Sequence, residues 1–267
     1  MNDPHQLTPD AKVRIGDLPT DAIHFHSNRQ EAEREFAELR EELVDLQYRL
    51  YAEGRRKLLV LLQAMDGGGK DGTIRHVFKG VNPQGVHVTA FKAPSAEELA
   101  RDYLWRVHKA VPPAGSIGIF NRSQYEDLLI VRVEKLVPEK VWRERYDQIN
   151  DFEKYLTQTG TTILKFFLHI SKAEQKQRFQ ARLEDEEKQW KFSVADLEKR
   201  KQWDDYMKAY EDVLNRCTTK WAAWYVIPSN QKWYRNLAIM RTIVTTMRDM
   251  KFKLPKAPAD IEEIQIT

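Results

Sequence analysis

The chain has 267 residues, of which 42% are hydrophobic and 31% are charged, and its formal net charge at pH 7 is +3. These proportions are typical of a globular protein in water and fit one α/β domain or two small domains. No apolar run approaches the roughly 20 residues that span a bilayer, and residues 1–19 are too polar for a signal peptide. Cys217 is the only cysteine, which excludes an intrachain disulfide and a cysteine-based zinc site. We therefore expect a cytoplasmic protein that has no contact with a membrane.

The N-terminal part of the chain is expected to form an arm followed by a long helix. Residues 1–27 carry little periodicity and are predicted to be an extended arm. Residues 28–53 are predicted to be helical, and Gly54 is a natural C-terminal cap. The helix has one apolar stripe with 3-4-3-4 spacing, made by Phe36, Leu39, Leu43, Leu46 and Leu50. This stripe is expected to pack on the core or, alternatively, to meet a neighbouring subunit.

Apolar runs then alternate with helical segments. Buried strands are expected at residues 58–62, 86–91, 116–120, 162–170 and 224–227, and helices at residues 71–81, 95–110, 124–135, 138–159 and 231–250. Capping boxes at Ser95 and Ser171 mark two of the helix starts. Strands separated by helices imply right-handed crossovers and a parallel sheet, which binds its ligands at the carboxyl ends of the strands. Three polar segments follow strand ends, so we expect them to converge at one edge of the sheet.

The first of these segments, residues 63–73, reads QAMDGGGKDGT and joins a strand to a helix. Glycine lets several backbone N–H groups point into one concavity, and the helix N-terminus adds positive potential. Lys70 adds a mobile charge that can bridge phosphate oxygens. The segment departs from the pattern G-x-x-x-x-G-K-[ST] because Ala64 replaces the first glycine and Asp71 replaces the hydroxyl residue. We expect a phosphate-binding loop.

Asp66 is a carboxylate inside this loop, where bare phosphate would repel it. The residue makes sense in a phosphate site if it holds Mg²⁺, a hard cation that prefers oxygen ligands. The alternative is that Asp66 only forms a turn before the glycines.

The second segment, residues 120–127, reads FNRSQYED. Arg122 offers a planar fork of donors suited to phosphate. Glu126 and Asp127 diverge by about 100° on a helix, so at most one points straight into a site. One could hold a metal while the other caps the helix or pairs with an arginine. A surface salt bridge is the alternative for Asp127.

The third segment spans residues 171–200 and is rich in basic residues. Arg178 and Arg182 are four residues apart and share one helix face. Residues 184–191 break the periodicity and are predicted to be a mobile loop whose charges close over phosphates. Closure would exclude water and favour transfer over hydrolysis. The alternative is a solvated helical hairpin.

Five ordered segments, spread over roughly residues 43–247, resemble motifs of the family-2 polyphosphate kinases. They are residues 64–72, 103–108, 120–127, 168–171 and 224–228, which read AMDGGGKDG, YLWRVH, FNRSQYED, LHIS and WYVIP. The resemblance implies a P-loop kinase-like α/β fold, a three-layer α/β/α sandwich with a parallel sheet and a helical lid. We accordingly divide the chain into an arm and amphipathic helix (1–54), a kinase domain (55–250) with a lid at about 171–203, and a C-terminal tail (251–267).

The second motif also suggests a subgroup. Members that mainly phosphorylate nucleoside diphosphates typically read F-D-R-S-W-Y-N-R, whereas here Asn121 replaces the aspartate and Glu126-Asp127 replaces Asn-Arg. This version resembles class III, whose members act on both AMP and ADP. The implied reaction is Mg²⁺-dependent transfer of the terminal phosphate of inorganic polyphosphate to AMP and ADP, giving ADP and ATP. Mn²⁺ is an alternative metal, and guanine nucleotides are alternative substrates.

The resemblance also assigns roles to individual residues. Catalytic roles fall to Asp66, Lys70, Arg122, Glu126, Asp127 and Arg178, with Asp66 and Glu126 as metal ligands. Phosphate or nucleotide binding falls to Gly67, Gly68, Gly69, Asp71, Gly72, Thr73, Arg75, Lys79, Asn121 and Arg182. Lys92 and Arg106 are further candidates for a basic track along the polyanion. The implied assembly is a homo-oligomer, a dimer or a tetramer, that binds no nucleic acid.

Two rival interpretations stay open at this point. An ordinary nucleoside monophosphate kinase that uses ATP as the donor would share the fold and the lid. A non-catalytic module that binds polyanions, such as nucleic acid, would show a steep salt dependence of binding without turnover.

Overall fold

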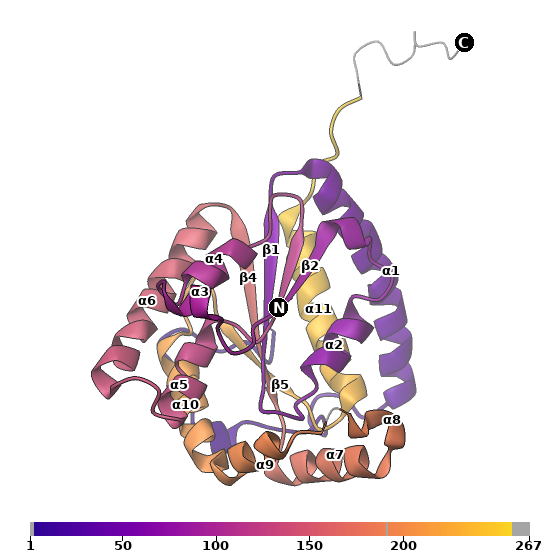
Figure 1. The fold of residues 1–267 in the computed structure, drawn as a ribbon. Coiled ribbons are helices and arrows are strands. Elements are labelled where there is room, and N and C mark those ends of the chain that lie inside the picture. The colour runs from indigo at the N-terminus through magenta and orange to yellow at the C-terminus, as the bar shows by residue number, and fades with distance from the viewer. Residues whose placement is uncertain (1–2, 191, 258–267) are drawn as a thin grey trace.

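Five strands form one parallel sheet in the computed structural model of the chain, which describes residues 3–190 and 192–257 (Figure 1). The strands are β1 (Lys57–Gln63), β2 (Val86–Ala90), β3 (Ile117–Asn121), β4 (Thr161–His169) and β5 (Trp224–Pro228). Their order across the sheet is β2-β3-β1-β4-β5, and every neighbouring pair is parallel. The predicted parallel sheet is confirmed, and each strand lies within one residue of its predicted ends.

Helices cover both faces of the sheet and give the expected three layers. One face packs against α1 (Arg29–Glu53), α2 (Lys70–Val77) and α11 (Lys232–Met250), and the other against α4 (Trp105–Ala110), α6 (Glu139–Gln158) and α10 (Trp203–Arg216). Within β1, Leu58, Val60 and Leu62 belong to the first apolar core, while Leu59 and Leu61 belong to the second. This alternation buries both faces of the strand, as expected for a parallel sheet covered by helices.

The long helix α1 begins and ends where the sequence predicts. Asn28 caps its N-terminus by accepting from two backbone N–H groups, and Gly54 ends it with a left-handed φ of 64°. Leu43, Leu46 and Leu50 of the apolar stripe are buried in the core that α1 shares with α11. The stripe therefore packs inside its own chain, which is the first of its two interpretations.

The N-terminal arm lies along the edge strand β5. The Val226 N–H donates to the His5 carbonyl at 2.9 Å, and the Leu7 N–H donates to the Trp224 carbonyl at 2.8 Å. The 3-10 helix η1 (Ile15–Asp17) follows and is tied to α10. The arm is thus extended where it pairs with β5, and it shields an edge that would otherwise present unpaired backbone groups.

The predicted helix at residues 95–110 is broken into α3 (Ala96–Leu99) and α4. The Asp102 carboxylate accepts from the Leu104 N–H at 3.0 Å, a local bond that competes with helix continuation and opens a new helix. The predicted capping box at Ser95 is present in full. Local side-chain bonding thus overrides the apolar periodicity here.

Two further helices differ from their predictions. The segment 124–135 forms the 3-10 helix η3 (Gln124–Asp127) and α5 (Ile130–Val133), because the backbone at Leu129 is not helical. The helix predicted for residues 71–81 ends at Val77, ahead of a left-handed glycine at Gly80 and the 3-10 helix η2 (Pro83–Gly85).

Three helices, α7 (Lys172–Glu184), α8 (Glu186–Gln189) and α9 (Val194–Lys201), lie across the carboxyl ends of the strands (Figure 1). They occupy the region predicted to be a lid. Ser171 caps α7 by accepting from the Glu174 N–H at 3.0 Å. The segment 184–191, predicted to be a loop, contains α8 because Asp185 caps a new helix there; residue 191 lies outside the described residues.

The chain continues beyond α11 without regular structure over residues 251–257. Lys251 ends α11 with a left-handed φ of 50°. The rest of the predicted tail, residues 258–267, lies outside the described residues. Within the described part of the chain, no helix is both long enough and apolar enough to cross a membrane.

Candidate active site

The loop between β1 and α2 turns so tightly that side chains do not fit at its centre. Gly67 and Gly69 have φ values of 81° and 99°, in the left-handed region that favours glycine. A Cβ at residue 68 would lie 2.4 Å from the Cβ of Ala64. A glycine loop that leads into the N-terminus of a helix is the arrangement that binds phosphate oxygens.

Lys70 is the first residue of α2, and its ammonium group lies within the loop. Its Nζ donates to the Ala64 carbonyl at 2.9 Å, and only 8% of the residue is exposed. Burial lowers the pKa of Lys70, and the negative charge of Asp66 opposes that shift. The side chain is therefore held at the position where the sequence predicts a contact with phosphate.

Asp66 lies among three cationic side chains. Its Oδ1 accepts from Arg122 at 2.6 Å, and its Oδ2 accepts from Lys199 at 3.2 Å. Burial raises the pKa of Asp66, but the charges of Lys70, Arg122 and Lys199 together outweigh burial and hold that pKa below its usual value. The carboxylate is thus ionised at neutral pH, as a metal ligand has to be.

Lys199 belongs to α9 of the lid, and the sequence offered no specific reason to select it. It lies in a run of charged residues that reads as an ordinary solvated helix face. The structure brings it to Asp66 across 133 residues of sequence, which only the folded lid achieves. Gln175 of α7 also reaches this loop and donates to the Asp66 carbonyl at 2.7 Å.

Arg122 and Glu126 complete a small pocket beside Asp66. Arg122 follows β3 with a left-handed φ of 64°. Met65, Lys199, Tyr206 and Tyr210 are among the other residues that line the pocket. Burial lowers the pKa of Arg122, but Glu126 and Asp66 outweigh it and raise that pKa above the ordinary value. Asp66, Arg122 and Glu126 therefore converge as predicted.

Asp127 faces elsewhere. Its carboxylate pairs with Arg145 of α6 at 2.6 Å, and both side chains are 13% exposed. Burial raises the pKa of Asp127 to about 6, against the opposing charge of Arg145. The structure thus supports the alternative in which Asp127 pairs with an arginine, and it gives the residue no place in the pocket that Glu126 lines.

Arg178 supports the loop from the lid instead of facing open space. Its guanidinium group has five N–H donors, and all five have protein acceptors. The acceptors are the Glu174 carboxylate and the backbone carbonyls of Gly67, Gly68, Ser229 and Asn230. This geometry differs from the predicted catalytic role, because no donor is left for substrate. Arg182 Nη1 lies 3.8 Å from Oδ2 of Asp196 in α9, so this ion pair is formed within the lid.

The remaining predicted phosphate ligands lie along α2, just beyond its end and at the end of β3. The Asn121 side chain donates to Asp71 at 2.6 Å and so links the end of β3 to the start of α2. Thr73 is buried and its hydroxyl has no hydrogen-bond partner within the described part of the chain. Arg75 and Lys79 are exposed further along, outside the pocket beside Asp66.

The donor set suits a metal that keeps part of its water shell. Within residues 3–190 and 192–257, no three His, Cys, Asp or Glu side chains cluster as a ready-made metal site. Asp66 and Glu126 nevertheless line one pocket with oxygen donors. Mg²⁺ is commonly bound through one or two carboxylates and substrate phosphates, and this arrangement fits that requirement.

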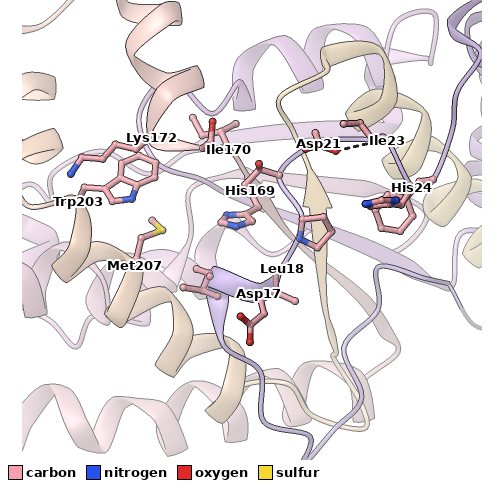
Figure 2. Close-up of a pocket in the computed structure, with 16 residues that line it drawn as sticks. Asp17, Leu18, Asp21, Ile23, His24, His169, Ile170, Lys172, Trp203 and Met207 are labelled. Atoms are coloured by element: carbon pink, nitrogen blue, oxygen red, sulfur yellow. Dashed lines mark hydrogen bonds between the residues drawn. The ribbon is translucent and has the colours of Figure 1, made fainter.

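A larger cavity of about 630 Å³ lies at the base of the lid, and no residue of the glycine loop lines it (Figure 2). Residues of the N-terminal arm, the end of β4 and the start of α10 line it. His169 points into this cavity, and burial lowers its pKa to about 4. Ser171 and Trp203, where the lid begins and ends, also line it. None of the residues predicted for phosphate binding is part of this cavity.

The fold defines an α/β protein with a parallel five-strand sheet, a glycine loop that leads into α2 and three helices across the carboxyl ends of the strands. The family model described as Polyphosphate kinase 2 (PPK2) matches residues 26–255. The chain belongs to the polyphosphate kinase 2 family.

Several relatives resemble the chain over almost its whole length. It is 51% identical over 263 residues to the AMP/ADP-polyphosphate phosphotransferase of Meiothermus ruber, covering 98% of each chain. It is 44% identical to the ADP-polyphosphate phosphotransferase of Rhodopseudomonas palustris, over 95% of this chain and 92% of that protein. The crystal structure of polyphosphate kinase 2 from Arthrobacter aurescens TC1 superposes with a TM-score of 0.92 at 41% identity, covering 97% of this chain and 93% of that one. The predicted family and fold class are confirmed.

Proposed function

We propose that the protein is a polyphosphate-dependent nucleotide kinase that converts AMP to ADP and ADP to ATP. A phosphate oxygen of the nucleotide forms a bond to the terminal phosphorus of inorganic polyphosphate. The bond from that phosphorus to its bridging oxygen breaks, and the polyphosphate leaves one unit shorter. The observation that carries the proposal is the Asp66 carboxylate, held ionised by Arg122 and Lys199 beside Lys70 in a phosphate loop.

The chain needs no general base for this reaction, because the attacking phosphate oxygen is already an anion. Catalysis of phosphoryl transfer is then mostly positioning and neutralisation of charge. Lys70 and the loop N–H groups bind the reacting phosphates, and Arg122 neutralises the group in transfer. The lid helices exclude water, which favours the nucleotide over water as the acceptor.

A divalent metal completes the proposal. Asp66 and Glu126 would hold Mg²⁺, or Mn²⁺ in its place, and the bound ion would neutralise charge on the phosphates. Arg122 binds Asp66 Oδ1 and orients the carboxylate, while Lys199 occupies Oδ2 in the absence of the ion. Cytoplasmic location and a homo-oligomeric assembly, dimer or tetramer, are part of the same proposal.

Use of both AMP and ADP is the finer part of the proposal. The motif at residues 120–127 has the form that resembles class III, and the relative from Meiothermus ruber is named for both acceptors. The relative from Rhodopseudomonas palustris is named for ADP alone. We therefore expect ADP to accumulate first from AMP and ATP to follow.

The test is a time course with AMP, polyphosphate and Mg²⁺ in the absence of ATP. Chromatography should show ADP and then ATP. A parallel reaction with AMP and ATP but no polyphosphate tests the alternative that the protein is an ATP-dependent nucleoside monophosphate kinase. Turnover in the second mixture alone would reject the proposal, and binding of polyphosphate without turnover in either would favour the polyanion-binding module.

A further inference from the structure

A buried guanidinium group that the sequence did not single out lies against the phosphate loop. Arg235, near the start of α11, is only 2% exposed. Its Nη1 donates to the Gly68 carbonyl at 3.4 Å, and its Nε and Nη2 donate to Asn236 Oδ1 at 3.1 and 2.8 Å. A Cβ at residue 69 would lie 2.1 Å from Nη1. Arg235 thus fills the space that a side chain at Gly69 would need.

Arg178 contacts the same stretch of loop from the lid. Its Nη1 donates to the carbonyls of Gly67 and Gly68 at 2.9 and 3.1 Å. Two guanidinium groups, one from α7 and one from α11, therefore hold consecutive carbonyl groups of the loop. A carbonyl held in this way fixes its peptide plane, and with it the direction of the next N–H group.

The protein around these two arginines balances only one of their charges. Glu174 pairs with Arg178 at 2.7 Å. Within residues 3–190 and 192–257, no carboxylate lies at ion-pair distance from Arg235. Burial and the nearby charge of Arg178 lower the pKa of Arg235 to about 9. A buried cation without an opposite charge nearby destabilises the fold, and an anion bound in the loop would relieve that cost.

We propose that Arg235 is a positioning residue of the phosphate loop, which orients the Gly68 peptide and whose buried charge is balanced when a phosphate occupies the loop. The inference rests on the proposed function only for the identity of the phosphoryl donor, polyphosphate. The role of Arg235 itself requires only that the loop binds an oligophosphate. The charge acts through the loop backbone, so its effect is expected mainly on binding of phosphate.

Arg235→Met and Arg235→Lys test this, with Arg241→Met as a matched control on the same helix. Arg241 pairs with Glu35 of α1 at 2.5 Å. The melting temperature is measured with and without inorganic tripolyphosphate, and KM and kcat are measured with polyphosphate. In Arg235→Met, the melting temperature without ligand should stay equal or rise, and the shift caused by tripolyphosphate should fall by at least half.

The same variant should raise KM for polyphosphate about 10- to 100-fold, the effect of losing a charged hydrogen-bonding group, with a smaller fall in kcat. Arg235→Lys should recover part of this loss, while Arg241→Met should leave KM and the ligand-induced shift unchanged. A lower melting temperature without ligand, with an unchanged KM and an unchanged shift, would mean that Arg235 is only structural and would overturn the inference.

If circular dichroism shows that Arg235→Met does not fold, Asn236→Ala carries the test, because it releases the guanidinium group without removing its charge. A raised KM is then expected, and an unchanged KM overturns the inference. Stabilisation by tripolyphosphate is measured without turnover. A wild-type protein that binds tripolyphosphate but transfers nothing would therefore reject the proposed function and leave the role of Arg235 to be decided by binding.

Discussion

The ammonium group of Lys165 lies 2.7 Å from the carboxylate of Glu153, and both side chains are fully buried. Lys165 comes from β4 and Glu153 from α6. Gln124 and Tyr125 of η3 both donate to the same Glu153 oxygen, at 3.0 and 2.7 Å. The ion pair therefore joins the sheet and α6 to the segment that carries Glu126 into the candidate active site.

Replacing Lys165 with methionine should lower the free energy of unfolding by about 3–5 kcal/mol, because Glu153 is left buried without its partner. Urea unfolding measures the change. The double variant Lys165→Met/Glu153→Leu should recover part of the loss. Lys201→Met is the control, since Lys201 pairs with Glu198 on the surface and such pairs contribute less than about 1 kcal/mol. Equal losses in the single and double variants would contradict this view of the pair.

Gly68→Ala should reduce kcat/KM about 100-fold or more while the protein stays folded, because misplacing a reacting group by about 1 Å has an effect of that size. The new Cβ would lie 2.4 Å from the Ala64 Cβ and would push the loop apart. Steady-state kinetics and circular dichroism measure the two effects. The matched control is Gly16→Ala, where no atom lies within 4 Å of the new Cβ. Normal activity in Gly68→Ala would remove the loop from the reaction.

Lys199→Met should lower the Mg²⁺ concentration that gives half-maximal activity by up to about 5-fold, since a partly exposed ion pair contributes at most about 1 kcal/mol. Lys199 and a metal ion would compete for the same Asp66 oxygen, which now accepts from Lys199 at 3.2 Å. A Mg²⁺ titration of initial rates measures this. A higher Mg²⁺ requirement in the variant would show that Lys199 assists the metal instead of competing with it.

His169 should make the fold sensitive to acid. Burial lowers its pKa from 6.5 to about 4, so between these values the unfolded chain binds a proton that the folded chain does not. The contribution of neutral His169 to the free energy of unfolding is therefore fully present above pH 6.5. It falls by about 1.4 kcal/mol per pH unit as the pH drops toward 4. Urea unfolding of wild type and His169→Gln at pH 7.5 and 5.0 isolates this contribution. The variant should lose roughly 2 kcal/mol less on acidification. Equal losses would assign the acid sensitivity to other groups.

The convergence of Asp66, Lys70, Arg122 and Glu126 could be predicted because each follows the end of a strand in one parallel sheet. In such a sheet the carboxyl ends share an edge, so order along the chain is enough to bring them together. The helix breaks at residues 100–104 and 128–129 could not be read from apolar periodicity, since hydrogen bonds of single residues such as Asp102 decide them.

The partners of the loop could not be predicted because they come from distant helices. Lys199 and Arg235 belong to charged or mixed segments with no motif of their own, and only the folded lid and α11 bring them to Asp66 and Gly68. Arg178 shows the converse. The sequence placed it in the right region, but its role depends on how many of its N–H donors the folded protein already uses.

Direct transfer from polyphosphate to the nucleotide is tested by following the transferred phosphate itself. Polyphosphate with a ³²P-labelled terminal phosphate is incubated with AMP, Mg²⁺ and the wild-type protein, without ATP, and with Lys70→Ala in parallel. We expect the label in the β-phosphate of ADP with the wild type and no label in ADP with the variant. Label found only in inorganic phosphate, or unlabelled ADP, would contradict direct transfer from polyphosphate to the nucleotide.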